Sequence, residues 1–191
     1  MTARSGPGKM AGWESLVPAR HAGLAGTVLG VSQQSPGAGL AIRQAGPEDA
    51  GEVIRLAALM YEAMGLDAAD PAWRVAAAAA LASRPGADAV VFVADAPGPA
   101  GRLAATGAGT IATRLPGPAN RGATVGYIQW VSTDPQWRRR GLARLITAAL
   151  LGWFREREVG AVELHATPEA AALYRSLGFG PGANPGLRIR L

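Results

Sequence analysis

The run RRRGLA at residues 138–143 constrains the fold more than any other part of the chain, because it joins a predicted strand directly to a predicted helix. The β-rich residues 124–132 precede it, and residues 139–157 follow with apolar side chains on one helical face. Gly141 and the small Ala143 allow the backbone to approach a ligand closely, and the first free N–H groups of a helix attract anions. The sequence therefore predicts a turn that binds a diphosphate, with arginines that screen its negative charge.

The other segments alternate between strand and helix patterns, without an internal repeat. Strands are predicted at residues 40–44, 89–94, 103–113, 124–132, 162–166 and 187–191, and helices at residues 47–64, 70–84, 139–157 and 168–177. This order predicts a single α/β domain with a mixed sheet. Because residues 1–38 are rich in Gly, Pro, Ser and Gln, we expect a flexible N-terminal extension before a domain at residues 39–191.

Composition narrows the functional classes. The chain has no cysteine, which excludes thiolate metal sites and cysteine nucleophiles. His21 and His165 lie far apart without the spacing of metal ligands, so no metal is expected. No stretch reaches the roughly 18 apolar residues of a membrane span, and no secretory signal is visible, so we expect a cytoplasmic protein without a membrane partner. The net charge of +5 is compatible with a nucleic-acid partner, but aromatic residues do not interleave with the basic cluster, so none is expected.

A second motif lies at residues 167–179, where a short helix carries Tyr174 near its end and breaks at Gly178. Together with RRRGLA, in this order and at this separation, it resembles motifs A and B of the GNAT superfamily of N-acetyltransferases. The resemblance covers about residues 40–191 and includes the first strand and the start of the first helix. It implies an α/β GNAT (acyl-CoA N-acyltransferase) fold, with a mixed, mostly antiparallel sheet of six to seven strands flanked by helices.

The resemblance also implies which residues hold acetyl-CoA, the donor co-substrate. Tyr174 is expected to act as the general acid, because a neutral phenol, with a pKa of about 10, can protonate the leaving thiolate. Two positions depart from the family pattern: Thr167 stands where an asparagine that contacts the cofactor is usual, and Tyr127 stands where some members carry a catalytic glutamate. Thr167 keeps a hydroxyl for the cofactor contact. The other expected contacts are Val131, Ser132 and Thr133 for the acetyl-pantetheine arm, and the backbone of Arg138, Arg139, Arg140, Gly141, Leu142 and Ala143 for the pyrophosphate.

The implied reaction is direct attack of a bound primary amine on acetyl-CoA in a ternary complex, with a small molecule as the expected acceptor. The resemblance implies that Tyr61, Glu62 and Trp130 flank the acceptor groove, whereas we interpret Trp73 as a core residue. Glu62 and His165 are the nearest candidates for a general base, each with an alternative structural role, and a water chain could equally accept the proton. Acetylation of protein lysines or N-termini, and acyl-CoA binding without useful catalysis, are the alternatives. The expected assembly is a monomer or a homodimer.

Overall fold

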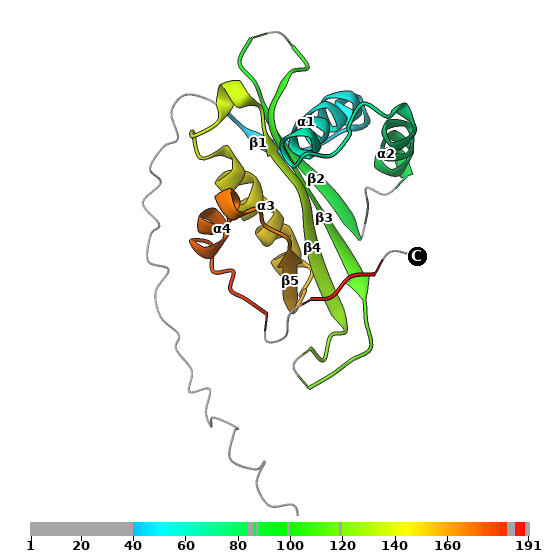
Figure 1. The fold of residues 1–191 in the computed structure, drawn as a ribbon. Coiled ribbons are helices and arrows are strands. Elements are labelled where there is room, and N and C mark those ends of the chain that lie inside the picture. The colour runs from blue at the N-terminus through cyan, green and yellow to red at the C-terminus, as the bar shows by residue number, and fades with distance from the viewer. Residues whose placement is uncertain are drawn as a thin grey trace, which may run out of the picture. The chain divides into compact units, whose positions relative to one another are not determined.

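The structure, a computed structural model, describes residues 40–189 except 84, 85, 87, 99, 119 and 183–185. The predicted extension at residues 1–38 lies outside the described residues, so the domain boundary stays a prediction. Figure 1 shows the elements in chain order: β1 (Ile42–Gln44), the 3-10 helix η1 (Pro47–Asp49), α1 (Ala50–Ala63), α2 (Pro71–Ser83), β2 (Ala89–Asp95), β3 (Leu103–Thr113), β4 (Thr124–Thr133), the 3-10 helix η2 (Pro135–Trp137), α3 (Leu142–Glu156), β5 (Ala161–Leu164) and α4 (Pro168–Arg175).

The strands form one sheet in the order β1-β2-β3-β4-β5. The first three junctions are antiparallel, and β4 and β5 are parallel. Helices α1 and α2 lie on one face of the sheet and α3 on the other, as Figure 1 shows. The predicted α/β class with a mixed, mostly antiparallel sheet is therefore confirmed. Among the described residues, no helix has both the length and the apolar character needed to cross a membrane.

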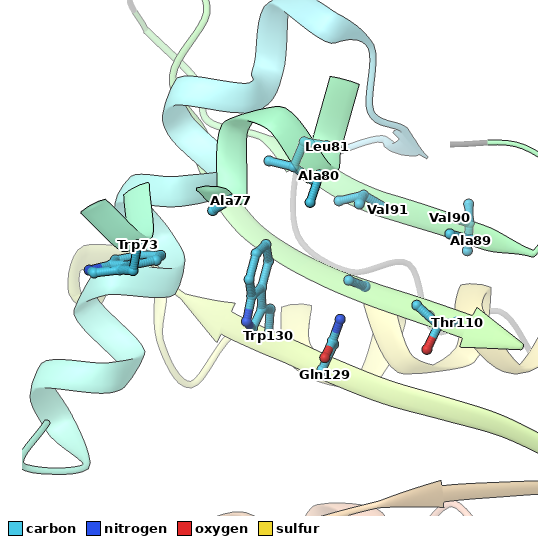
Figure 2. Close-up of a pocket in the computed structure, with 12 residues that line it drawn as sticks. Trp73, Ala77, Ala80, Leu81, Ala89, Val90, Val91, Thr110, Gln129 and Trp130 are labelled. Carbon is cyan, nitrogen blue, oxygen red and sulfur yellow. The ribbon is translucent and has the colours of Figure 1, made fainter. Parts of the chain in front are cut away.

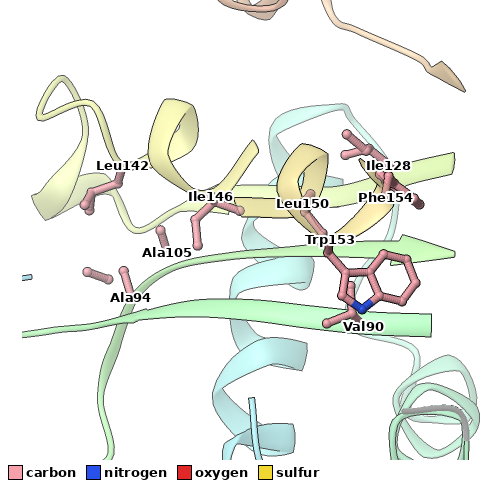
Figure 3. Packing of buried hydrophobic residues seen from close by; sticks show 10 residues of the cluster. Val90, Ala94, Ala105, Ile128, Leu142, Ile146, Leu150, Trp153 and Phe154 are labelled. Atoms are coloured by element: carbon pink, nitrogen blue, oxygen red, sulfur yellow. The ribbon is translucent and has the colours of Figure 1, made fainter. Parts of the chain in front are cut away.

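Helix α3 packs very closely on the strands, and this contact positions the start of the helix. Ile146, Leu150 and Phe154 are almost fully buried against β2, β3 and β4 (Figure 3). A Cβ atom added to Gly107 would lie 2.5 Å from Ile146 Cγ2, and one added to Gly126 would lie 2.6 Å from Phe154 Cε1. These strand positions therefore need glycine so that α3 can approach the sheet, which brings the turn before α3 next to the end of β4.

Two expectations about the elements are wrong. The closing strand predicted at residues 187–191 is not formed by its described part: Leu187 and Ile189 lie outside any strand and are 97% and 80% exposed. Their alternating pattern is that of a strand, but without a neighbouring strand the backbone has no ladder to join. The sheet consequently has five strands in the described region, rather than six to seven. Residues 190 and 191 lie outside the described residues.

The second correction concerns the start of the long helix, which was predicted at about Arg139. Helix α3 begins at Leu142, because Arg139 and Gly141 have φ values of 64° and 81°. These values belong to the left-handed region, which a right-handed helix cannot include. The residues before Leu142 thus form a separate turn rather than a first helical turn.

Candidate functional site

The parallel strands β4 and β5 separate at one end and leave a cleft between them. Their pairing runs only from Val125 with Ala161 to Ile128 with Leu164, whereas β4 continues to Thr133. The β4–β5 cleft that opens beyond Leu164 has a volume of about 550 Å³. Eight of the residues predicted to contact donor or acceptor line this cleft: Trp130, Val131, Ser132, Thr133, Arg138, Ala143, Thr167 and Tyr174.

A β-bulge in β4 shapes one wall of the cleft. Gln129 pairs with Ala108 and Ser132 pairs with Thr106, so two β4 residues lie opposite the single residue between them on β3. Trp130, the first of the two, has φ 56°, which is a strained conformation for a large side chain. Because of the bulge, Gln129 and the neighbouring Trp130 both reach the face of the sheet that carries α1 and α2 (Figure 2). The sequence contains no signal for this change of register.

The turn before α3 presents backbone N–H groups. Within the described part of the chain, the amides of residues 139–144 have no hydrogen-bond acceptor, and the first bond of the helix runs from the Leu145 amide to the Gly141 carbonyl. A Cβ atom on Gly141 would meet nothing within 4 Å, so glycine is required there by its φ of 81° and not by space. Free amides at a helix start, next to the positive end of its dipole, favour the binding of an anion. The predicted contact of this turn with a pyrophosphate stays a prediction.

The arginine side chains of the turn differ in what they contact. Arg138 lines the cleft, and its Nε donates to the Thr133 carbonyl at 3.3 Å. The guanidinium of Arg140 instead lies 4.6 Å above the ring of Trp137. Arg139, Arg140, Gly141 and Leu142 are not among the residues that line the cleft, and Leu142 is a core residue with 2% exposure. The predicted contacts of these residues therefore depend on their backbone groups.

Tyr174 places a buried phenol in the wall of the cleft. It is 8% exposed, lies at the end of α4 and makes an edge-to-face contact with Phe179, with 5.9 Å between the ring centres. Its hydroxyl has no hydrogen-bond partner in the described region, although it lines the cleft. Burial raises the pKa of the Tyr174 phenol above its ordinary value, so the hydroxyl keeps its proton at neutral pH.

A histidine and a tyrosine form a hydrogen-bonded pair on the wall of the same cleft. The Tyr127 hydroxyl and His165 Nδ1 are 2.9 Å apart, and His165 lines the cleft just after the end of β5. Glu62, the other predicted base, is exposed and does not line the cleft. Both residues were named from the sequence, but the pairing of Tyr127 with His165 depends on the register between β4 and β5 and could not be predicted.

An aromatic group connects α1, α2 and β4 beside the cleft. Trp130 Nε1 donates to the Tyr61 hydroxyl at 2.7 Å, and the Tyr61 ring lies edge-on to Trp73 at 5.6 Å. The structure thus brings together Tyr61 and Trp130, two of the three residues predicted to flank the acceptor groove. The third, Glu62, is exposed and does not join this aromatic group. Trp73, interpreted as core from the sequence, is only half-buried. Sequence reasoning missed Gln129, although it lies two residues after Tyr127 and thus on the same face of a regular strand.

A chain with this fold, in which splayed parallel strands lead to the free amides of a helix start, has the architecture of the acyltransferases that use acyl-CoA. The family model described as "Acetyltransferase (GNAT) family" matches residues 55–179, so the chain belongs to the GNAT acetyltransferase family. No curated protein matches the chain. In the described residues, no group of three or more His, Cys, Asp or Glu side chains could hold a metal ion.

Solved structures have the same fold. A GCN5-related N-acetyltransferase from Ralstonia eutropha is similar over 79% of this chain and 99% of that chain, with a TM-score of 0.67 and 24% identity. A predicted acetyltransferase from Clostridium acetobutylicum, solved with acetyl-CoA, has a TM-score of 0.67 and 20% identity over 80% of this chain and 96% of its own. Glucosamine-6-phosphate N-acetyltransferase from Arabidopsis thaliana has a TM-score of 0.59 and 18% identity over 80% and 99% of the two chains.

Proposed function

We propose that the protein is an N-acetyltransferase that transfers the acetyl group of acetyl-CoA to a primary amine of a small molecule, within a ternary complex. One observation carries the proposal: the β4–β5 cleft contains a buried phenol without a hydrogen-bond partner in the described region, Tyr174, and is also lined by Arg138 of the turn and by Ala143 at the start of α3, where the amides are free. A thioester donor with a diphosphate requires both a proton donor and a set of anion-binding groups.

The donor is held mainly by backbone groups in this proposal. The amides of residues 139–144 hydrogen-bond the pyrophosphate, aided by the dipole of the 15-residue helix α3. The edge of β4 that β5 leaves unpaired, from Gln129 to Thr133, hydrogen-bonds the pantetheine arm. A free N–H of this edge near Val131 would also bind the acetyl oxygen, and one such donor is typically worth about 3 kcal/mol in the transition state. The acetyl-CoA in the Clostridium acetobutylicum relative supports this choice of donor.

Tyr174 has the properties of the general acid. Acetyl-CoA supplies the activated acetyl group, and the Tyr174 hydroxyl donates its proton to the sulfur as the carbon–sulfur bond breaks. Burial keeps the phenol neutral until that step, because it raises the pKa of the group. With no partner among the described residues, the hydroxyl is also available to a ligand sulfur without first breaking a protein hydrogen bond.

His165 is the general base that the geometry favours over Glu62. In the tautomer whose Nδ1–H donates to the Tyr127 oxygen, Nε2 carries a lone pair that can accept the proton of the attacking amine. Tyr127 then orients the imidazole ring and is a positioning residue. Glu62 lies outside the residues that line the cleft, so it lacks access to the reacting nitrogen.

A thiol-release assay over a panel of amines and peptides, run beside calorimetry with acetyl-CoA, tests the proposal. We expect acetyl-CoA to bind and at least one small amine to give saturable release of coenzyme A. Binding without release for any acceptor would contradict the proposal and favour an acyl-CoA-binding module. Release with lysine-containing or N-terminal peptides, but not with free amines, would replace the small-molecule acceptor with a protein acceptor.

A further inference from the structure

A second cavity lies between α2 and the sheet, and the proposed function does not yet use it. This α2 pocket has a volume of about 210 Å³. Figure 2 shows Trp73, Ala77, Ala80 and Leu81 of α2 on one side of it, with Thr110 of β3 and Gln129 of β4 on the other. The pocket exists because α2 presents alanines to the sheet at Ala77 and Ala80, and methyl groups leave the space that longer side chains would fill.

The α2 pocket and the β4–β5 cleft are neighbours. Gln129 and Trp130 line both cavities, because the bulge at Trp130 directs the two consecutive side chains to one face of the sheet. His165 lines the same cleft as Gln129 and Trp130. A molecule that extends along the cleft from His165 to Gln129 and Trp130 therefore reaches residues that also line the α2 pocket.

Among the residues that the structure describes, no charged side chain lines the α2 pocket. The indole N–H of Trp73 donates to the Ala68 carbonyl at 3.2 Å, and that of Trp130 donates to the Tyr61 hydroxyl at 2.7 Å, so both are already used. The side chains of Thr110 and Gln129 remain as uncharged polar groups. A phosphate or a second ammonium group would lose its hydration in such a pocket and find no counter-ion.

We propose that the α2 pocket binds the non-reacting end of the acceptor and selects an amine that carries a compact apolar group, such as a phenyl ring or a branched alkyl chain. The inference rests on the proposed function, since it assigns the substrate class of the same reaction. The apolar group packs against Trp73 and the alanines of α2, and Gln129 hydrogen-bonds the polar part of the molecule near the amine. Sugar phosphates and polyamines are poor acceptors.

The test compares two substitutions on the same helix. Ala80→Leu fills the pocket, whereas Ala79→Leu places the same side chain at the exposed neighbouring position and serves as the control. KM is measured by thiol release for 2-phenylethylamine, glucosamine 6-phosphate and putrescine, and acetyl-CoA affinity is measured by calorimetry. Ala80→Val provides a smaller change in case the leucine variant does not fold, as judged by its thermal unfolding.

We expect the wild-type KM for 2-phenylethylamine to be at least tenfold below the KM for glucosamine 6-phosphate or for putrescine. Ala80→Leu should raise the KM for 2-phenylethylamine at least tenfold, and Ala80→Val should raise it by less. Ala79→Leu should raise this KM by less than twofold, and the acetyl-CoA affinity should be unchanged in all three variants. Turnover in which the Ala80 variants keep the wild-type KM, or in which glucosamine 6-phosphate or putrescine is preferred to 2-phenylethylamine, would overturn the pocket assignment while the proposed function stands. Acetyl-CoA binding without turnover of any amine would overturn the proposed function, and the pocket assignment with it.

Discussion

The β4–β5 cleft and the α2 pocket share Gln129 and Trp130 but are built in different ways. Backbone conformation makes the cleft: two strands that separate, a bulge, and a turn with left-handed φ values. Side chains make the pocket, with alanines and tryptophans from α2 and β4 around a hollow on an otherwise regular sheet face. The comparison teaches that the cleft, the proposed donor side, depends on how the chain folds, whereas the pocket, the proposed acceptor side, can change by substitution alone. Variants on the two sides should therefore have separable effects.

The largest expected effect is that of Tyr174→Phe, which removes the proposed proton donor without changing the shape of either cavity. It therefore separates the chemical step from the binding of donor and acceptor. Loss of the proton donor should lower kcat about 100-fold. The phenyl ring keeps its contact with Phe179, so acetyl-CoA affinity and the KM of the amine should stay within about twofold of wild type. Rapid kinetics of thiol release and calorimetry measure the two quantities. Equal loss of turnover and affinity, or unchanged turnover, would reject the acid role.

Asp134→Asn tests the ion pair between Asp134, which follows β4, and Arg55 of α1. Asp134, which precedes the turn before α3, accepts a hydrogen bond from Arg55 of α1 at 2.8 Å and from the Gln136 amide at 3.1 Å. Burial raises the pKa of the Asp134 carboxyl, but these two hydrogen bonds, together with the positive charges of Arg55 and Arg102, outweigh burial and hold the pKa below its ordinary value. We expect the substitution to lower the free energy of unfolding by about 2 kcal/mol at neutral pH.

The sign of the pH dependence follows from that lowered pKa. The carboxylate stabilises the fold fully above the pKa of the unfolded chain, and this contribution is lost as the pH falls through the folded-state pKa. The difference between wild type and Asp134→Asn in urea denaturation should therefore shrink in acid. A difference that stays constant with pH would show that the Asp134 charge does not contribute.

Gly141→Ala tests whether backbone conformation makes the donor site. A left-handed φ of 81° costs alanine about 1 kcal/mol, so without a ligand the turn of this variant adopts another backbone conformation. Acetyl-CoA must then restore the original conformation and should bind about fivefold more weakly. Gly152→Ala, within α3 and also with nothing within 4 Å of the added Cβ, is the control and should leave affinity unchanged. Calorimetry measures the acetyl-CoA affinity of both variants. Equal affinities in the two variants would contradict the proposal that the turn conformation holds the donor.

The smallest expected effect is that of His165→Gln. Because His165 is exposed, water can replace much of its function, and kcat should fall only about fivefold. The informative readout is kcat, measured by thiol release for each variant. Tyr127→Phe should lower kcat less than His165→Gln does, as expected of a positioning residue. An unchanged kcat in His165→Gln, with a lowered kcat in Glu62→Gln, would assign the base to Glu62.

The sequence allowed prediction of the features that depend on local conformation. Gly141 at a strand-to-helix turn and Tyr174 before a helix-breaking glycine both have local signatures, and the α/β class followed from the order of the elements. The apolar alternation at residues 187–189 wrongly suggested a strand, because alternation does not reveal whether a partner strand is present.

Features that depend on register or on packing between distant elements could not be predicted. The bulge at Trp130 adds one residue to β4 relative to β3, and no residue type at that position signals it. The pair of Tyr127 and His165 requires the parallel register of β4 and β5. The hollow beside Ala80 arises from small side chains on α2 that meet the sheet, and a run of alanines alone indicates only a helix.

The most direct test of the central claim is a crystal structure of the protein with coenzyme A. The account predicts pyrophosphate oxygens within hydrogen-bonding distance of the amides of residues 139–144 and a sulfur within reach of the Tyr174 hydroxyl in the β4–β5 cleft. It also predicts that the α2 pocket contains no part of coenzyme A. A pyrophosphate bound elsewhere, or a pantetheine arm that enters the α2 pocket, would contradict the division of donor and acceptor between the two cavities.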